Sequence, residues 1–359
     1  MRYWIPVGLA LFAIACNGDK DNGVDSDNVG DADTDTDTDT DTDTDTDTDG
    51  FAWPASYDDY VFGETSYLHT FFIPDMNGGN PCCRDWGAIS RDAGDDNALA
   101  GIAAAAGLFQ LDVQDTIDQT ILDGGFVALL DHNDIPEGDG DYHMAFFRGE
   151  FNQLTTDWQS ASQGFGEFYV DPINFIDLTG TPRALFANTN ITGNQLLATD
   201  GLFEIAMPLT PGSLLILPLQ DVQIEGEVTR TDEGVKIDNG RLSGYVTTDD
   251  FYGAYNEVIS DLCGCLGVQG DLFTDNGDGT WDANCVDNAA ALCTLPDEDV
   301  CPIMGGDALF GNGEICGVIP VLMNGAPDID LDNDPTVYEA LSAGLRFQAE
   351  GGTILGLLP

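Results

Sequence analysis

Apolar and polar residues alternate along much of the chain after residue 51. From Val222 to Thr229, apolar residues at 222, 224 and 228 alternate with Gln, Glu and Thr, and the alternation resumes over 235–246. A period of two places the apolar side chains on one face of a β-strand. Gly234 and Asn239-Gly240 are typical turn signals between such strands. Short apolar runs at 126–130 and 142–147, on either side of the polar turn 131–141, are expected to be strands, and 202–209 and 214–219 are expected to be more deeply buried strands.

Three other segments have apolar residues at helical spacing. One covers 99–106 and follows Asp96-Asn97, two residue types that cap helix N-termini. A second covers 113–121 and is stopped by Gly124-Gly125, and a third covers 250–262. The last strands, 345–347 and 353–358, are expected to form a C-terminal hairpin. We therefore predict an α+β fold, mainly an antiparallel β-sheet or sandwich with a few packed helices and a disulfide-rich insertion.

The first sixteen residues have the pattern of an export signal. Arg2 precedes an apolar run from Tyr3 to Ile14, which is too short for an ordinary membrane-spanning helix. The run ends in Ala13-Ile14-Ala15-Cys16, which resembles the lipobox of bacterial lipoproteins, although Ala13 replaces the usual leucine. The resemblance implies that Cys16 is acylated and becomes the first residue. The alternative is plain secretion with cleavage after Ala15.

A low-complexity acidic segment follows at 17–50. It contains eight consecutive Asp-Thr pairs from Asp33 to Thr48 and has almost no apolar residues to bury. Such a segment is expected to be disordered and extended by its own charge, with a maximal reach of about 110 Å. It is predicted to be a tether, with calcium sequestration as the alternative. The domain prediction is thus a signal peptide at 1–16, a tether at 17–50 and a globular extracytoplasmic domain at 51–359.

Negative charge is not confined to the tether. Of the 64 acidic residues, fourteen lie in 17–50 and fifty follow, against eight Lys or Arg in 51–359. A domain this acidic repels nucleic acid and anionic membrane surfaces. It suits calcium, a salt-rich medium or a cationic partner.

The cysteine count also favours export. Without Cys16 an even number remains, as expected for disulfides in an oxidising compartment. Zinc binding is less consistent with the spacing, because Cys263-x-Cys265 and the vicinal Cys82-Cys83 do not match C-x-x-C pairs. Segment 263–316 holds most of them and is predicted to be a disulfide-stapled excursion. The candidate disulfide cysteines are Cys82, Cys83, Cys263, Cys265, Cys285, Cys293, Cys301 and Cys316.

The best candidate for bound metal lies near the C-terminus. With Asp328 as position 1, acidic residues fall at positions 3, 5, 7 and 12, the ligand spacing of an EF-hand calcium loop. Asn333 replaces the glycine at position 6, and Pro335 at position 8 restricts the loop. The alternative is a solvated acidic turn. The candidate calcium ligands are Asp328, Asp330, Asp332, Asp334 and Glu339.

Catalytic motifs are absent from the sequence. It has neither H-E-x-x-H nor a G-x-S-x-G elbow, and its three histidines are His69, His132 and His143. His132 and His143 flank an Asp-rich turn that includes Asp134, so a secreted hydrolase with an unrecognised site there is the alternative to a non-enzymatic protein. A third hypothesis is a salt-adapted acidic surface protein that binds no specific cation.

Several of these motifs occur together. The lipobox, the Asp-Thr tether, Cys82-Cys83-x-Asp85 and the acidic loop before Ala340 together resemble uncharacterised lipoproteins of myxobacteria and their relatives. The resemblance implies a location in the cell envelope, anchored by lipid at the outer membrane, and implies no activity. We expect a disulfide-stabilised envelope protein with a binding or structural role, calcium as its cofactor, and an unknown ligand or protein partner.

Overall fold

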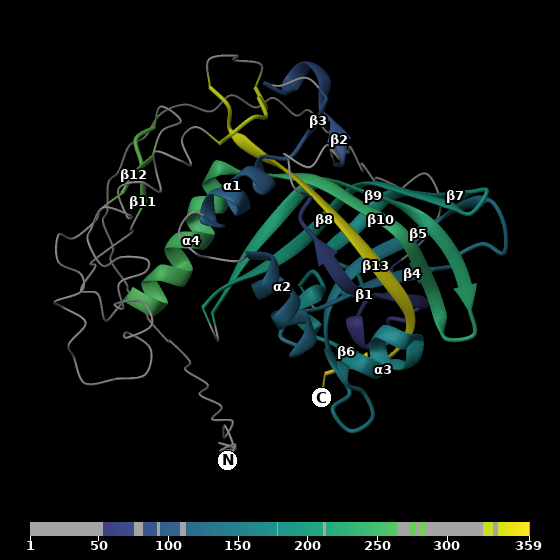
Figure 1. Cartoon of the computed structure of the whole chain (residues 1–359). Helices are drawn as coiled ribbons and strands as arrows, with labels where there is room; N and C mark the ends of the chain where they lie inside the picture. The colour runs from purple at the N-terminus through teal and green to yellow at the C-terminus, as the bar shows by residue number, and fades with distance from the viewer. Residues whose placement is uncertain are drawn as a thin grey trace, which may run out of the picture. The chain divides into compact units, whose positions relative to one another are not determined.

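A closed β-barrel forms the centre of the protein. The computed structural model describes residues 53–74, 82–91, 94–107, 113–177, 179–210, 213–263, 273–277, 281–283, 326–332 and 337–358, all within the unit Ala52–Pro359. Eight strands pair antiparallel in chain order (Figure 1). They are β1 (Glu64–Phe72), β4 (Val127–Asn133), β5 (Gly140–Phe151), β7 (Ala184–Thr192), β8 (Gln195–Thr210), β9 (Ser213–Thr231), β10 (Gly234–Thr247) and β13 (Ala340–Leu357).

Strand β1 closes the barrel. Its Tyr67 lies opposite Leu129 of β4 on one side and opposite Glu350 of β13 on the other. Closure removes the exposed strand edges that an open sheet would present to other chains. The prediction of a mainly antiparallel β fold is confirmed, but the sheet is a barrel rather than a sandwich. Alternation in a sequence reports which face of a strand is buried and carries no information on which strands meet.

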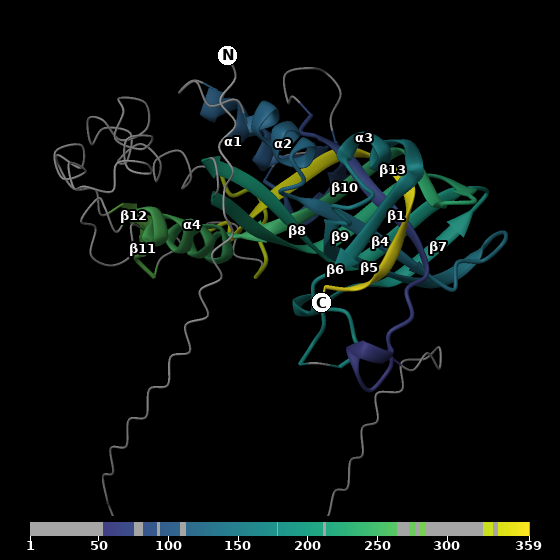
Figure 2. The same cartoon turned by 90° about the horizontal axis from the view of Figure 1, so that it is seen from below.

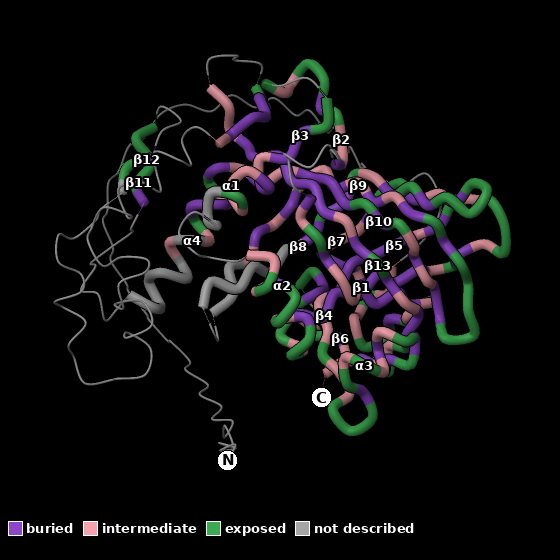
Figure 3. Tube along the Cα trace, viewed as in Figure 1, coloured by how far each residue is buried: buried purple, intermediate pink, exposed green. Residues whose placement is uncertain are grey.

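Alternate residues of the barrel strands point inward and fill the interior. On β9 the inward residues Val222 and Ile224 are fully buried. The rings of Phe146 on β5 and Phe203 on β8 lie 4.2 Å apart inside the barrel. An eight-stranded barrel is just wide enough for side chains to fill its interior. Buried residues are concentrated along the strands and exposed residues at the turns (Figure 3).

A second apolar layer covers part of the outside. Strand β6 (Gly166–Val170) pairs antiparallel with β5 and parallel with β13. It helps to enclose a separate cluster that includes Tyr67, Leu129, Phe147 and Phe168. Strands β1, β4 and β5 are therefore buried on both faces, which explains why the β4 sequence is a continuous apolar run rather than an alternating one.

Three helices pack against the barrel core (Figures 1 and 2). They are α1 (Ala98–Gly107), α2 (Val113–Leu122) and α4 (Thr248–Cys263), and each confirms a predicted helix. The remaining elements are short: β2 (Arg84–Asp85), β3 (Asp95–Asp96), α3 (Trp158–Ser160), β11 (Phe273–Asp275), β12 (Trp281–Ala283) and the single turns η1 (Tyr57–Asp59), η2 (Gly87–Ile89), η3 (Ala161–Phe165) and η4 (Pro172–Asn174).

Two predicted turns lie inside strands. The expected C-terminal hairpin is wrong, because Ala340–Leu357 is one continuous strand in which Gly351 and Gly352 pair with β1. Asn239-Gly240 lies within β10, where the pairing with β13 shifts register and Asn239 has a φ of +55°. A positive φ at Asn is as typical of a β-bulge as of a turn. The turn at Gly234 is confirmed, since Gly234 pairs with Thr231 across the β9–β10 hairpin.

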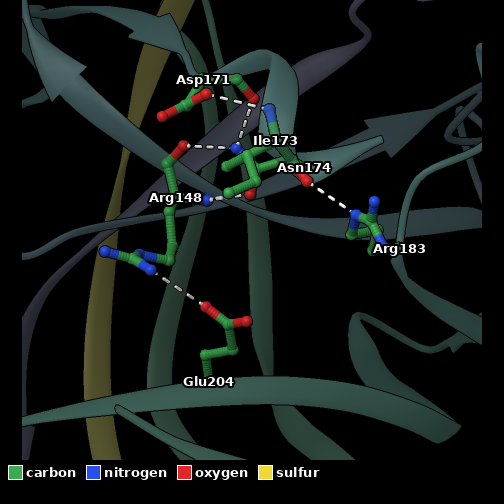
Figure 4. Close-up of polar contacts among 6 residues, drawn as sticks. All are labelled: Arg148, Asp171, Ile173, Asn174, Arg183 and Glu204. Atoms are coloured by element: carbon green, nitrogen blue, oxygen red, sulfur yellow. Dashed lines mark hydrogen bonds and ion pairs between the residues drawn. The ribbon is translucent and has the colours of Figure 1, made fainter. Parts of the chain in front are cut away.

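A side chain replaces a missing strand beside β5 (Figure 4). Pairing between β5 and β7 ends at Phe146 and Ala184, so the backbone of Arg148 has no β7 partner. Asn174 supplies both bonds: its Oδ1 accepts from the Arg148 N–H at 2.9 Å and its Nδ2 donates to the Arg148 carbonyl at 2.9 Å. The Arg148 guanidinium lies 3.4 Å from the Glu204 carboxylate of β8. One carboxamide thus continues the ladder where no strand is present.

Candidate metal centre

The predicted calcium loop lies where the chain enters β13. Backbone hydrogen bonds hold it on both sides: the Asp330 N–H donates to the Ile89 carbonyl at 2.8 Å, and the Glu339 N–H donates to the Ile329 carbonyl at 3.0 Å. Ile329 also forms isolated β-bridges with Ser90 and Ala340. The acidic segment is therefore fixed between residues 89–91 and the first residue of β13.

Three of the candidate ligands converge. A carboxylate oxygen from each of Asp330, Asp332 and Glu339 lies within 4.8 Å of the others. Glu339 is oriented by the Leu331 N–H, which donates to its Oε2 at 2.9 Å. Two negative charges at this separation repel by about 1 kcal/mol in water and about 3.5 kcal/mol at an effective dielectric constant of 20. Hard oxygen ligands at this spacing suit a calcium ion, which would remove the repulsion.

Asp328 does not join this group. It is 4% exposed, and its carboxylate accepts from the Ser342 N–H at 2.8 Å and from the Ser342 hydroxyl at 2.5 Å. Burial raises the pKa of the Asp328 carboxyl, although both hydrogen bonds from Ser342 act in the opposite direction. The first position of the EF-hand-like spacing thus binds Ser342, and its role as a calcium ligand stays a prediction. Asp334 lies outside the described residues.

Asp328 is one of several side chains that bind the backbone along the unpaired edge of β13. Pairing with β1 begins at Arg346, so residues 340–345 have a strand partner only on the β10 side. Asn97 covers Gly344: its Nδ2 donates to the Gly344 carbonyl at 2.8 Å, and its Oδ1 accepts from the Gly344 N–H at 3.0 Å. The sulfur atoms of Cys82 and Cys83 lie 3.8 and 3.4 Å from the Leu345 carbonyl oxygen.

The disulfide framework stays a prediction. The sulfurs of Cys82 and Cys83 are adjacent, which is a contact between neighbouring residues rather than a staple between distant parts of the chain. The backbone of Cys263 ends α4, and its side chain is outside the described part. The other candidates, together with the lipidation residue Cys16, also lie outside the described residues: Cys265, Cys285, Cys293, Cys301 and Cys316.

A polar network lies inside the barrel around His132. The Ser66 hydroxyl donates to the Val235 carbonyl at 2.6 Å, so at 2.8 Å it accepts from His132 Nε2. The other ring nitrogen, Nδ1, then accepts from the Tyr142 hydroxyl at 2.9 Å. Complete burial lowers the pKa of His132 to about 3, so the imidazole is neutral. Because Nε2 carries a proton, it does not serve as a base for Ser66. This network was not predicted from the sequence, in which its signal was three residues with polar groups at inward strand positions, Ser66, His132 and Tyr142.

The residues of the hydrolase hypothesis do not come together. His132 points into the barrel, whereas His143 lies on the outer face of β5, where its ring packs edge-on to Trp53. Asp134 is exposed at the turn between the two strands. His69 lies on β1, outside this turn. Within the described part of the chain this geometry gives the hydrolase hypothesis no support.

Asp131, the neighbour of His132, is buried on the opposite face of β4. Its carboxylate accepts from the Tyr60 hydroxyl at 2.8 Å, from the Gly63 N–H at 2.7 Å and from Asn133 Nδ2 at 3.2 Å. Burial nevertheless raises its pKa to about 6. These bonds attach the segment before β1 to the barrel wall.

Comparison of the whole chain with protein-family models, curated proteins and solved structures finds no match. Among the described helices, none has the length and apolar character needed to cross a membrane.

Proposed function

We propose that this chain is a lipid-anchored envelope protein whose barrel has a binding or structural role and whose loop at the start of β13 binds calcium. Support for the anchor comes from the signal-like residues 1–16 ending in Cys16 and from the acidic tether that follows. Acylation of Cys16 would place the barrel outside the cytoplasm, on the membrane surface. The resemblance to myxobacterial lipoproteins favours the outer membrane.

The observation that carries the calcium proposal is the convergence of Asp330, Asp332 and Glu339 within 4.8 Å. Asp330 is held in place by the backbone of Ile89, and Glu339 directly precedes β13. A calcium ion bound to these carboxylates would fix the end of the long segment between α4 and β13 against the barrel. In this proposal the ion is structural: it holds Asp330, Asp332 and Glu339 together, and no chemical step depends on it.

A calcium titration tests the proposal. Extracellular calcium modules typically bind with a Kd of about 10⁻⁴ to 10⁻³ M. At 10 mM calcium the native state would then gain about 1.5 to 3 kcal/mol, which corresponds to an increase in Tm of about 3 to 10 °C over a chelator control. Asp332→Asn and Glu339→Gln are expected to abolish the increase, whereas Glu227→Gln, an exposed carboxylate of β9, keeps it.

The salt-adaptation hypothesis gives a different result in the same assay. If NaCl raises the Tm as much as CaCl₂ does at equal ionic strength, and the two cluster variants respond like Glu227→Gln, the calcium proposal is wrong and the acidity is a general adaptation. The anchor is tested separately by mass spectrometry of the native protein. An N-terminal peptide with unmodified Cys16 would exclude lipidation.

A further inference from the structure

Arg346 differs from most of the cations around it. In the described part of the chain, Arg91 donates to the Pro327 carbonyl, and ion pairs with carboxylates are formed by Arg84, Arg148, Arg230, Lys236 and Arg241. Arg346 forms neither an ion pair nor a hydrogen bond with the described residues, and its Nε is buried without a partner. This is unexpected in a chain with 64 acidic and 10 basic residues, where carboxylates are abundant.

The register places a second cation directly beside Arg346. Arg346 of β13 lies opposite Arg241 of β10 on one side and opposite Phe72 of β1 on the other. Its neighbours Leu345 and Phe347 point into the barrel, so this row of residues points outward. The Cβ atoms of directly opposed residues are about 4.5 to 5.5 Å apart, and like charges in such pairs are destabilising.

The row of outward residues that contains Arg346 and Arg241 carries more positive than negative charge. Arg241 lies 3.4 Å from the Glu225 carboxylate of β9, and Arg346 has no acidic partner of its own. This row therefore holds two guanidinium groups and one carboxylate, which is paired with Arg241, and the result is a local excess of positive charge. At physiological ionic strength charges are screened over about 8 Å, so this local excess acts on a bound ligand more strongly than the distant acidic surface does.

We propose that Arg346, Arg241 and Phe72 form a binding subsite for a single carboxylate carried on a ring. Guanidinium groups recognise carboxylates through paired N–H donors, and the two terminal Nη groups of Arg346 donate to none of the described residues, whereas its buried Nε is closed to a ligand. Phe72 is 51% exposed and offers an apolar face next to the charged group. The acidic surroundings disfavour densely charged polyanions. A sugar acid and an aromatic acid share the required chemistry.

Ligand-observed NMR on the full chain tests the proposal with galacturonate and benzoate, and with galactose and benzyl alcohol as neutral counterparts. We expect at least one acid to bind and its neutral counterpart not to bind, and the tighter of the two acids identifies the source. Arg346→Gln and Arg241→Gln are expected to weaken that binding at least tenfold. Arg183→Gln is the matched control, because Arg183 is exposed and donates to the Ile173 carbonyl, and it should change binding less than twofold.

Three outcomes would overturn the subsite. They are no binding of either acid at 10 mM, equal binding of acid and neutral counterpart, and loss of binding in Arg183→Gln as large as in Arg346→Gln. If Arg346→Gln does not fold, Arg241→Gln and Phe72→Ser decide, since both side chains are exposed on the same row. Unchanged affinity in both of these variants would refute the proposal.

Discussion

Replacing Asn97 by alanine tests the idea that side chains complete the edge of β13. Asn97 makes three hydrogen bonds to backbone: two to Gly344, and a third in which its Oδ1 accepts from the Ala100 N–H at 3.2 Å. It therefore serves as the N-cap of α1 and as a substitute strand at once. Asn97 is 7% exposed, and Gly344 is buried, so water does not readily replace the lost bonds.

The expected loss follows from these contacts. Removing an N-cap costs about 1 kcal/mol. Each buried backbone group left without a partner costs about 1 to 3 kcal/mol, and Gly344 would have two. We expect Asn97→Ala to lower the free energy of unfolding by about 3 to 7 kcal/mol, a large part of the total of about 5 to 15 kcal/mol typical of folded proteins. Asn97→Asp keeps both acceptor roles and loses the donor, so its loss should be intermediate.

Urea unfolding followed by circular dichroism measures these losses. The matched control is Asn188→Ala, because Asn188 is exposed and its Nδ2 donates to another exposed side chain, Asp200. Surface substitutions of this kind change stability by about 0.5 kcal/mol or less. A loss below about 1 kcal/mol for Asn97→Ala, or a loss equal to that of the control, would refute the reasoning.

The other predictions concern two buried titratable groups and two glycines. Between about pH 4 and 6.5 the folded state binds more protons than the unfolded state at Asp131 and fewer at His132, so their effects on stability oppose each other. Relative to the unsubstituted chain, the free energy of unfolding should rise with pH across this window in Asp131→Asn and fall in His132→Gln, each by about 3 kcal/mol. Urea unfolding at pH 4, 5 and 6.5 measures this pH dependence. If it is unchanged in both variants, the pKa shifts assigned to Asp131 and His132 are wrong. Gly344→Ala should destabilise by about 1 to 3 kcal/mol because its Cβ would lie 2.5 Å from the Cys82 carbonyl oxygen. Gly253→Ala in α4, with open space around it, should stabilise by about 0.5 to 1 kcal/mol in the same assay.

The sequence predicted those features that depend on nearby residues. The three long helices were predicted because their spacing and caps lie within one stretch of chain, and Asn97 does cap α1 as expected. Strand faces were predicted for the same reason. Closure of the barrel was not, because it depends on pairing between Tyr67 and Glu350, which are far apart in the sequence. Gly351 and Gly352 resembled a turn for lack of any local signal that β1 lies beside them.

The candidate metal site shows the same difference between features set by nearby residues and features set by distant ones. Asp330 and Asp332 are close because they are two residues apart in one loop, and Glu339 joins them because its N–H donates to the Ile329 carbonyl. The spacing did not predict the partner of Asp328, whose carboxylate accepts from the Ser342 N–H fourteen residues later. That partner is set by the position of β13 in the barrel, which the spacing of acidic residues does not report. His132, likewise, became interpretable only once its inward position on β4 was known.

Asp328, Asn97 and Asn174 point to one physical cause for these differences. Each short polar side chain binds a backbone group that no strand reaches, two beside β13 and one beside β5. A buried backbone group needs a partner, and Asp and Asn are short enough to provide one without displacing the strand. In a chain this rich in Asp and Asn, regularly spaced carboxylates therefore bind backbone as well as being candidates for metal binding. Asp328 is buried and accepts two hydrogen bonds from Ser342, whereas Asp332 and Glu339 lie within 4.8 Å of Asp330 and are the residues whose substitution should remove calcium binding.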